Sequence, residues 1–415
     1  MANDFVKTFV QMCNYLQEPC HVARFQNFCG VKGTFPVKTS KPDSGQPEQD
    51  STGLRKRFQQ SSDISVGNGA TGDAAGAQVN GMQGDNAAAP GAASDPDTAR
   101  AKPLRRNSLT GDVGQEFLIH NKFLFYLFTF GTELGNEMFF IIFFPFVFWN
   151  IDALVSRRLI VVWAWNLFVG QSTKDMVRWS RPASPPVVKV EVFYNSEYSM
   201  PSTHAMTGTA IPFCLFMLTY GRWQYPFLFG FGVALSWSVL VCVSRVYMGM
   251  HSILEVITGF LYSLLILAFF HPILDKIDSF YMMGHYAPLV IIVSHALGTG
   301  AGAALATYVN YQLGLLMDPP LSSLPLTFPS ISTSLVFLSL LRFLIGVAVL
   351  LVTRMIMKAV TIPFLCRLFG LPSDDVRQAR QHMKVELPYR YIVYSVVGFS
   401  CVCVVPLLFR ILNLA

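Results

Sequence analysis

The sequence carries little charge. Only 13% of its 415 residues are Asp, Glu, Lys or Arg, whereas 52% are hydrophobic. A soluble domain carries charge on about 25% of its residues. A single soluble core cannot bury so much apolar side chain, because long chains divide into several domains with polar surfaces. The shortage of charge therefore excludes an ordinary cytosolic enzyme and indicates a protein whose surroundings are partly lipid.

Two other patterns are missing. The eight cysteines form no Cys-x-x-Cys pair, so the usual spacing of a structural zinc site is lacking, and most of them stand in apolar runs as small core residues do. The net charge of +6 does not come from a separate basic domain, because residues 1–121 hold 12 basic and 12 acidic groups. The surplus belongs to the hydrophobic part of the chain, which excludes nucleic acid as a partner.

Aromatic residues are absent between Phe58 and Phe117, in a stretch rich in Gly, Ala, Ser and Asp. Such a stretch cannot bury enough apolar surface to offset its ordering entropy, so we expect residues 36–116 to be disordered. Ser108 follows two arginines and resembles a site for a basophilic kinase, which requires this segment to face the cytosol. Residues 1–35 are weakly amphipathic and predict a helix that either lies on a membrane surface or packs on the rest of the protein.

What is present in quantity is long apolar stretches, which begin at residue 122. A bilayer core of about 30 Å needs about 20 apolar residues per helix. Stretches of this kind lie near 122–149, 155–173, 203–221, 225–244, 252–271, 286–306, 334–357 and 390–413. They predict an all-α polytopic membrane protein of about 8–9 transmembrane helices, divided into a membrane-embedded core (117–275) and C-terminal transmembrane helices (276–415).

The first apolar stretch is interrupted by polar residues, including Glu133 and Glu137. It is either one tilted helix or two shorter elements joined by a kink. Acidic groups at membrane depth suggest function, but a position at a helix end or bend is the favoured interpretation.

Lys and Arg in short loops predict the orientation of the spans. Arg157, Arg158, Arg222 and Lys276 can all face the cytoplasm, as can the basic residues between 367 and 390. The loop 307–333, which contains no Lys or Arg, then falls on the opposite side. The side of the N-terminus stays open, because one span at 122–149 and the basic residues at 100–106 point in opposite directions.

The same orientation places three polar segments on the non-cytoplasmic face, each at a helix end. They are 174–182, 201–204 and 244–251, and they contain Lys174, Arg181 and Arg245. Charged groups at membrane depth are costly and mark sites. Arginine offers bidentate hydrogen bonds to phosphate oxygens and lysine adds a point charge. We therefore expect the three cations to bind a phosphate dianion, together with Ser202 and backbone N–H groups at the start of a helix.

Two histidines add reactive groups to these segments. His251 is the candidate nucleophile, which attacks phosphorus and forms a phosphohistidine. His204 is the candidate general acid, which protonates the leaving oxygen and then activates water. Glu255 lies four residues after His251, so both share a helix face and the carboxylate can orient the imidazole.

Together the three segments resemble the signature of the phosphatidic acid phosphatase type 2 superfamily, Lys-x6-Arg-Pro, then Pro-Ser-Gly-His, then Ser-Arg-x5-His-x3-Asp. The resemblance implies a helical phosphatase core without a metal or other cofactor. It also implies phosphate-binding roles for Lys174, Arg181, Ser202 and Arg245, with His204 as acid and His251 as nucleophile. The chain departs from the pattern twice. Thr203 replaces Gly but keeps its backbone N–H for the phosphate, and Glu255 replaces Asp.

Longer runs resemble the sphingosine-1-phosphate phosphatases. The runs lie at 105–110, 130–137, 184–189, 192–200 and 379–391. This resemblance implies hydrolysis of sphingosine 1-phosphate and related long-chain base phosphates in the endoplasmic reticulum membrane, with the active site facing the lumen. Because these substrates carry an ammonium, Glu191 or Glu197 is a candidate contact for it, and a solvated loop acid is the alternative. Two other functions stay open, namely a lipid or sugar phosphatase of the same superfamily and a non-enzymatic membrane transporter.

Overall fold

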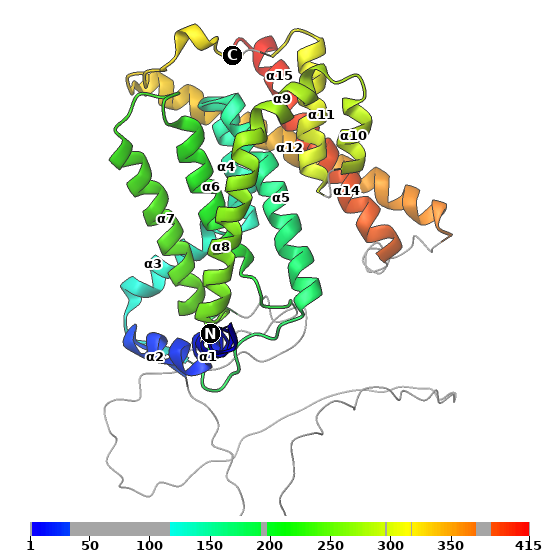
Figure 1. The fold of residues 1–415 in the computed structure, drawn as a ribbon. Helices are drawn as coiled ribbons and strands as arrows, with labels where there is room; N and C mark the ends of the chain where they lie inside the picture. The colour runs from blue at the N-terminus through cyan, green and yellow to red at the C-terminus, as the bar shows by residue number, and fades with distance from the viewer. Residues whose placement is uncertain are drawn as a thin grey trace, which may run out of the picture. The chain divides into compact units, whose positions relative to one another are not determined.

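The computed structural model describes residues 2–33, 117–191, 197–294, 297–316, 318–370 and 383–414. The predicted disorder of residues 36–116 and the candidate kinase site at Ser108 lie outside these ranges. In the described ranges the chain is mostly helical (Figure 1). The elements before the central helices are α1 (Ala2–Gln17), α2 (Pro19–Phe28), β1 (Val31–Gly33), β2 (Phe117–Ile119), α3 (Lys122–Glu133) and α4 (Glu137–Asn150). The central helices are α5 (Ala153–Val177), α6 (Thr203–Thr219), α7 (Phe227–Tyr247) and α8 (Ile253–Phe270).

The remaining elements follow α8. They are η1 (His271–Ile273), α9 (Leu274–Met283), α10 (Ala287–Ser294), α11 (Gly298–Gln312), η2 (Leu321–Ser323), α12 (Thr333–Leu368), α14 (Met383–Phe399), η3 (Ser400–Val404) and α15 (Val405–Ile411). Five helices or helix runs in the described ranges are long and apolar enough to cross a membrane, and a bent pair makes a possible sixth. The protein is therefore a multi-pass membrane protein. The predicted 8–9 spans are not confirmed.

The bent pair is α3 and α4, which meet at an angle of 65°. Asn136 begins α4 as its N-cap and accepts a hydrogen bond from the Met138 backbone. Glu133 and Glu137 are the residues on either side of the break. The structure confirms that these two acids lie at a bend, because α3 ends at Glu133 and α4 begins at Glu137.

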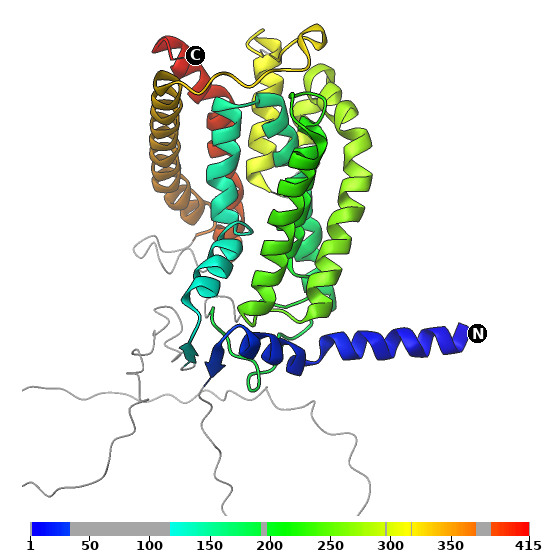
Figure 2. The same ribbon diagram turned by 90° about the vertical axis from the view of Figure 1, so that its left-hand side faces the viewer.

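The short strands connect the N-terminal helices to α3. β1 and β2 pair antiparallel, with Val31 opposite Ile119. Both ends of the long segment between them, residues 34–116, therefore lie at the same place. Figure 2 shows α1 running crosswise at the ends of α7 and α8, and contacts of α1 with α8 and of α2 with α7 fix this position.

The predicted span at 286–306 is wrong. Before this segment, Arg158 of α5 pairs with Asp275 and Asp278, each at 2.6 Å. After it, Arg157 pairs with Asp318 at 2.6 Å. Both flanks of α10 and α11 thus lie at the same end of α5, and the two helices enter and leave from one side. The glycines and alanines of α11 are buried against α14. Hydropathy cannot distinguish this hairpin from a span, because residues buried against protein and residues facing lipid are equally apolar.

Two expectations about orientation fail with that span. The loop 307–333 lies at the Arg157 end and not opposite to it. Helices α12 and α14 are antiparallel, because Arg342 near the start of α12 bonds the Leu414 carbonyl at 2.5 Å while its end packs against the start of α14. The described basic residues at the α12–α14 junction, such as Arg367, therefore lie toward the end opposite to Arg157.

Candidate active site

The three polar segments of the sequence meet at one end of α5, α6, α7 and α8. The end of α5 brings Lys174, the start of α6 brings Ser202 and His204, and the end of α7 brings Arg245. Local signals set these helix ends. Arg178 ends α5 in a left-handed conformation (φ 52°), and Ser202 is the N-cap that starts α6. This is the end at which α1 and α2 lie (Figures 1 and 2).

Two of the predicted phosphate-binding cations are almost fully buried. Lys174 is 2% exposed and donates hydrogen bonds to the Thr203 hydroxyl at 3.2 Å and to the Glu197 carboxylate at 3.1 Å. Arg245 is 1% exposed, and its Nη1 bonds the Glu191 carboxylate at 3.0 Å. Nε of Arg245 is buried and has no hydrogen-bond partner among the described residues. The two carboxylates thus hold the positions that the predicted anion requires.

The third cation, Arg181, comes from the loop between α5 and α6. Its Nη1 donates to the Met250 carbonyl and its Nε to the Glu197 carbonyl, both at 3.2 Å. Burial and the neighbouring positive charge of Arg245 lower its pKa. Like charges this close repel one another, which favours the binding of a dianion between them.

The candidate nucleophile lies beside Glu255, but the predicted shared helix face is wrong, because His251 precedes the N-cap of α8. His251 is 2% exposed, and its Nδ1 lies 2.9 Å from a carboxylate oxygen of Glu255. The same oxygen accepts from the Ser252 backbone N–H at 3.1 Å and from the Ser199 hydroxyl. Because Nδ1 is engaged, Nε2 is the nitrogen left to act as a nucleophile.

The capping box of α8 explains the presence of Glu at position 255. Ser252 is the N-cap and Glu255 the third helical residue, and each side chain bonds the backbone N–H of the other. Glu and Gln are the residues that the capping box typically has at that position. The extra methylene relative to Asp therefore lets one carboxylate start the helix and orient His251.

His204 lies in the first turn of α6, beside the bend between α3 and α4. A Cβ added to Gly135 of that bend would lie 3.3 Å from the His204 carbonyl and 2.8 Å from a Val241 methyl group, so glycine permits the close packing.

Burial lowers the pKa of His251 well below its ordinary value, and positive charge on Arg245, Arg181, Lys174 and His204 adds to the shift. These five groups therefore share one electrostatic site.

Sequence reasoning missed Ser199, which completes the group around the nucleophile. Its side chain is fully buried, and its hydroxyl lies 3.3 Å from Nδ1 of His251 besides bonding Glu255. The backbone N–H of Ser199 bonds the Trp179 carbonyl at 2.8 Å, which fixes this part of the loop. Ser199 lies within the run 192–200 that resembles the family, but nothing in the sequence distinguished it from the other residues of that run.

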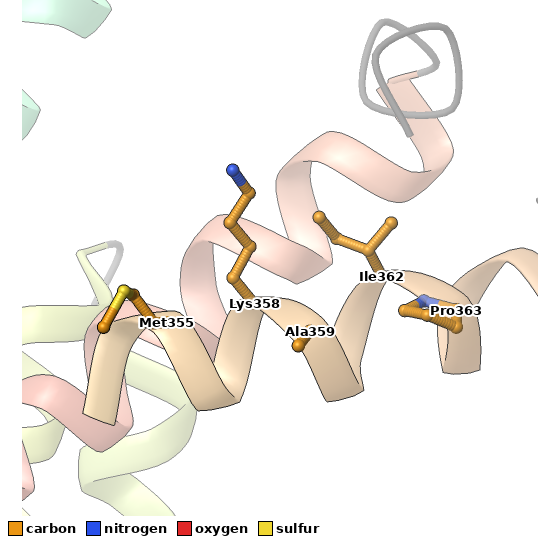
Figure 3. Close-up of a pocket in the computed structure, with 5 residues that line it drawn as sticks. All are labelled: Met355, Lys358, Ala359, Ile362 and Pro363. Carbon is orange, nitrogen blue, oxygen red and sulfur yellow. The ribbon is translucent and has the colours of Figure 1, made fainter. Parts of the chain in front are cut away.

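Two further features of the described residues lie apart from this site. Glu18, Cys20 and His21 of the N-terminal segment bring three metal-ligating atoms within 4.8 Å of one another. Figure 3 shows a hollow on α12 that is lined by Met355, Lys358, Ala359, Ile362 and Pro363. None of these residues belongs to the histidine cluster, the group around His204 and His251. The hollow has no converging polar groups, so it does not offer the chemistry of the cluster.

Known proteins resemble this chain in sequence. Residues 155–278 match the model of the PAP2 superfamily. Sphingosine-1-phosphate phosphatase 1 of Rattus norvegicus is 49% identical over 96% of this chain and 97% of its own length. Sphingosine-1-phosphate phosphatase 2 of Homo sapiens is 34% identical over 97% of this chain and 99% of its own length. No solved structure gives a significant match. With such identity over nearly its whole length, the chain belongs to the family of the sphingosine-1-phosphate phosphatases.

Proposed function

We propose that this protein hydrolyses sphingosine 1-phosphate and related long-chain base phosphates to the free base and phosphate. The observation that carries the proposal is the meeting of two buried cations, Lys174 and Arg245, with the His251–Glu255 pair at one end of the bundle. Buried charges are costly unless they are paired. Here the cations are paired with loop carboxylates that a phosphate dianion can replace.

In the first step, Nε2 of His251 attacks phosphorus in line with the ester oxygen. A P–N bond forms, the P–O bond to the lipid breaks, and His204 gives its proton to the departing oxygen. Lys174, Arg181 and Arg245 stabilise the charge that spreads over the other phosphate oxygens. The buried donor on Arg245 Nε gains an acceptor when phosphate binds.

In the second step, water attacks the phosphohistidine on the same phosphorus. His204, now neutral, accepts a proton from the water, the P–N bond breaks, and inorganic phosphate leaves. Glu255 holds the Nδ1 proton throughout and stabilises the positive imidazole of the intermediate. His204 thus returns to its protonated state, and no step requires a metal or other cofactor.

The two loop carboxylates suggest how the site could select substrates that carry an ammonium. Glu197 and Glu191 form ion pairs with Lys174 and Arg245, respectively. A phosphate that binds these cations displaces the two carboxylates, which then lie close to the ester. The ammonium of a sphingoid base phosphate lies two carbons from that ester, so a displaced carboxylate can bind it. We expect Glu197→Gln or Glu191→Gln to reduce discrimination between sphingosine 1-phosphate and phosphatidic acid, which has no amine. Unchanged relative kcat/KM for the two lipids would contradict this assignment.

The deciding experiment measures phosphate release from a panel of substrates in detergent. We expect turnover of sphingosine 1-phosphate by the wild type, weaker turnover of phosphatidic acid and glucose 6-phosphate, and none by His251→Ala. Preference for another phosphate would indicate a different enzyme of the superfamily. Wild-type turnover by His251→Ala would disprove the phosphohistidine mechanism, and no release from any substrate would favour the transporter.

We propose that the protein lies in the endoplasmic reticulum membrane with the active site facing the lumen. In support, Arg157, Arg158 and Arg222, which belong to early loops that weigh heavily in orientation, lie at the opposite end. In this arrangement α6, which has 17 residues, is a further span. The N-terminal α1 exposes apolar side chains such as Phe5 and Phe9 and lies on the luminal membrane surface.

A glycosylation site tests this orientation. Both flanks of residues 34–116 lie at the active-site end, so an acceptor within this segment reports the side of the active site. Ala70→Thr makes Asn68 an acceptor for N-glycans, and we expect an endoglycosidase-sensitive shift in mass. An unmodified protein would place the active site in the cytosol. The luminal proposal also excludes a cytosolic kinase at Ser108, because that residue belongs to the same segment.

A further inference from the structure

The N-terminal helix α2 reaches the active site through one buried amide. Gln26 is 1% exposed, and its Nε2 donates to the Val188 carbonyl at 2.6 Å and to the Tyr247 carbonyl at 2.9 Å. Its Oε1 accepts from the Val188 backbone N–H at 2.9 Å. Val188 belongs to the loop that carries Arg181, and Tyr247 lies between Arg245 and the nucleophile. One side chain therefore joins the two segments that supply the phosphate-binding arginines.

The two segments also touch directly. The Val190 backbone N–H bonds the Met248 carbonyl at 3.1 Å. Gly249 has a φ of +69°, and an added Cβ would lie 2.2 Å from the Val188 carbonyl and 2.8 Å from the Gln26 amide nitrogen. The turn before the nucleophile thus packs against the loop with no room for a side chain at Gly249. Gln26 contacts both segments at this junction, which is formed by the turn, the loop and α2.

The surroundings of the junction are apolar and belong largely to the N-terminal segment. Val22, Cys29 and Val31 are at most 4% exposed, and Cys29 and Val31 form one cluster with Val188 and Tyr247. A side chain that makes three hydrogen bonds in such surroundings holds its partners in one geometry, because a broken bond would leave a buried polar group without a partner.

We propose that Gln26 is a positioning residue of the phosphatase reaction, a role that rests on the function proposed above. It touches neither substrate nor reacting atoms. It sets the separation between Arg181 on the loop and two groups on the other segment, Arg245 at the end of α7 and His251 after it. In this way it aligns the phosphate-binding cations with the nucleophile. Gln26, which lies outside the matched superfamily region, therefore supports the reaction from the N-terminal segment.

The test compares the full-length wild type with Gln26→Leu, which keeps the size of the side chain and removes its hydrogen bonds. Gln26→Glu keeps the acceptor and removes both N–H donors. Gln11→Leu on the exposed face of α1 is the matched control. Because misplacement by about 1 Å can reduce rates about 100-fold, we expect kcat to fall by about 10- to 100-fold with KM for sphingosine 1-phosphate changed by less than about threefold.

Vanadate distinguishes positioning from a loss of folded protein. It mimics five-coordinate phosphorus, so its inhibition constant should rise by the same factor by which kcat/KM falls. Fewer folded molecules would reduce the apparent kcat and leave the inhibition constant unchanged, which would overturn the proposal. Gly249→Ala, combined with Gln26→Leu, should lose no more than the worse single variant, because both open the same junction.

The same experiment separates this inference from the proposed function. If Gln26→Leu and Gln26→Glu both keep the kcat and the vanadate affinity of the wild type while His251→Ala is inactive, the positioning role is wrong and the phosphatase mechanism stands. If the wild type releases no phosphate, or His251→Ala stays active, the proposed function itself fails.

Discussion

Replacing Glu255 by Gln tests the centre of the mechanism without disturbing the helix that carries it. A glutamine keeps the length of the side chain and can still accept from the Ser252 backbone N–H, so the capping box of α8 survives. What it removes is the negative charge 2.9 Å from Nδ1 of His251. That charge stabilises the imidazole when it becomes positive in the phosphohistidine.

The magnitude follows from the hydrogen bonds to this carboxylate. A hydrogen bond to a charged group contributes about 1.5–3 kcal/mol, against about 1 kcal/mol for a neutral one. Each 1.36 kcal/mol is a factor of about ten in rate, so loss of the charge alone lowers kcat by up to about 30-fold. If the amide turns its NH₂ toward Nδ1, the proton moves to Nε2 and blocks the nucleophile, as in a serine-protease triad whose Asp is replaced by Asn, which loses about 10⁴ in kcat.

The assay is single-turnover release of phosphate from sphingosine 1-phosphate at pH 7. We expect Glu255→Gln to be slower by about 2- to 30-fold if only the charge is lost, and by more if Nε2 is blocked. KM should change little, since the carboxylate does not contact the lipid. Ser252→Ala is the control, because it removes the cap hydroxyl and leaves the charge, and it should cost about 1 kcal/mol of stability with little loss of rate. Wild-type kcat in Glu255→Gln would refute the orienting role.

Three further predictions concern the same site. Because burial and Arg245 lower the pKa of His251, its neutral, nucleophilic form persists below pH 6.5, and the acid limb of kcat/KM should have its midpoint below that value; a midpoint above 6.5 contradicts the shift. Ser199→Ala removes a donor to a buried carboxylate, and kcat should fall by about 10-fold or more, since that bond contributes about 1.5–3 kcal/mol; an unchanged rate would show that Ser199 only packs. EDTA should leave turnover intact while vanadate inhibits it, and a loss restored by added metal would indicate metal-assisted hydrolysis instead.

The sequence was sufficient to find the chemical groups because the membrane leaves few charges to choose from. Lys174, Arg181 and Arg245 are among the few charged residues at the ends of apolar stretches. His251 and Glu255 meet, as their spacing suggested, although His251 precedes α8 and the two residues share no helix face. The polar interruption of the first apolar stretch also favoured a bend or helix end at Glu133 and Glu137. These features depend on the local sequence pattern, so they can be recognised without knowing which distant segments pack together.

The features that sequence missed depend on packing between distant parts of the chain. The hairpin of α10 and α11 has the hydropathy of a span, and only the pairing of Arg157 with Asp318 reveals that it returns to the same side. Gln26 stands in a weakly amphipathic helix more than 150 residues from its partners. Neither period nor composition distinguishes such a residue from an ordinary surface glutamine.

The direction of the four central helices explains why the site lies at this end. Lys174 and Arg245 lie in the last turns of α5 and α7, where carbonyl groups give the helix a partial negative charge that favours cations. Ser202 and Glu255 lie at the starts of α6 and α8, where free N–H groups favour anions. The antiparallel arrangement therefore places two cation-stabilising ends beside two anion-stabilising ends. In the proposed mechanism a phosphate dianion satisfies both, because it would pair with the cations and accept from the N–H groups of α6.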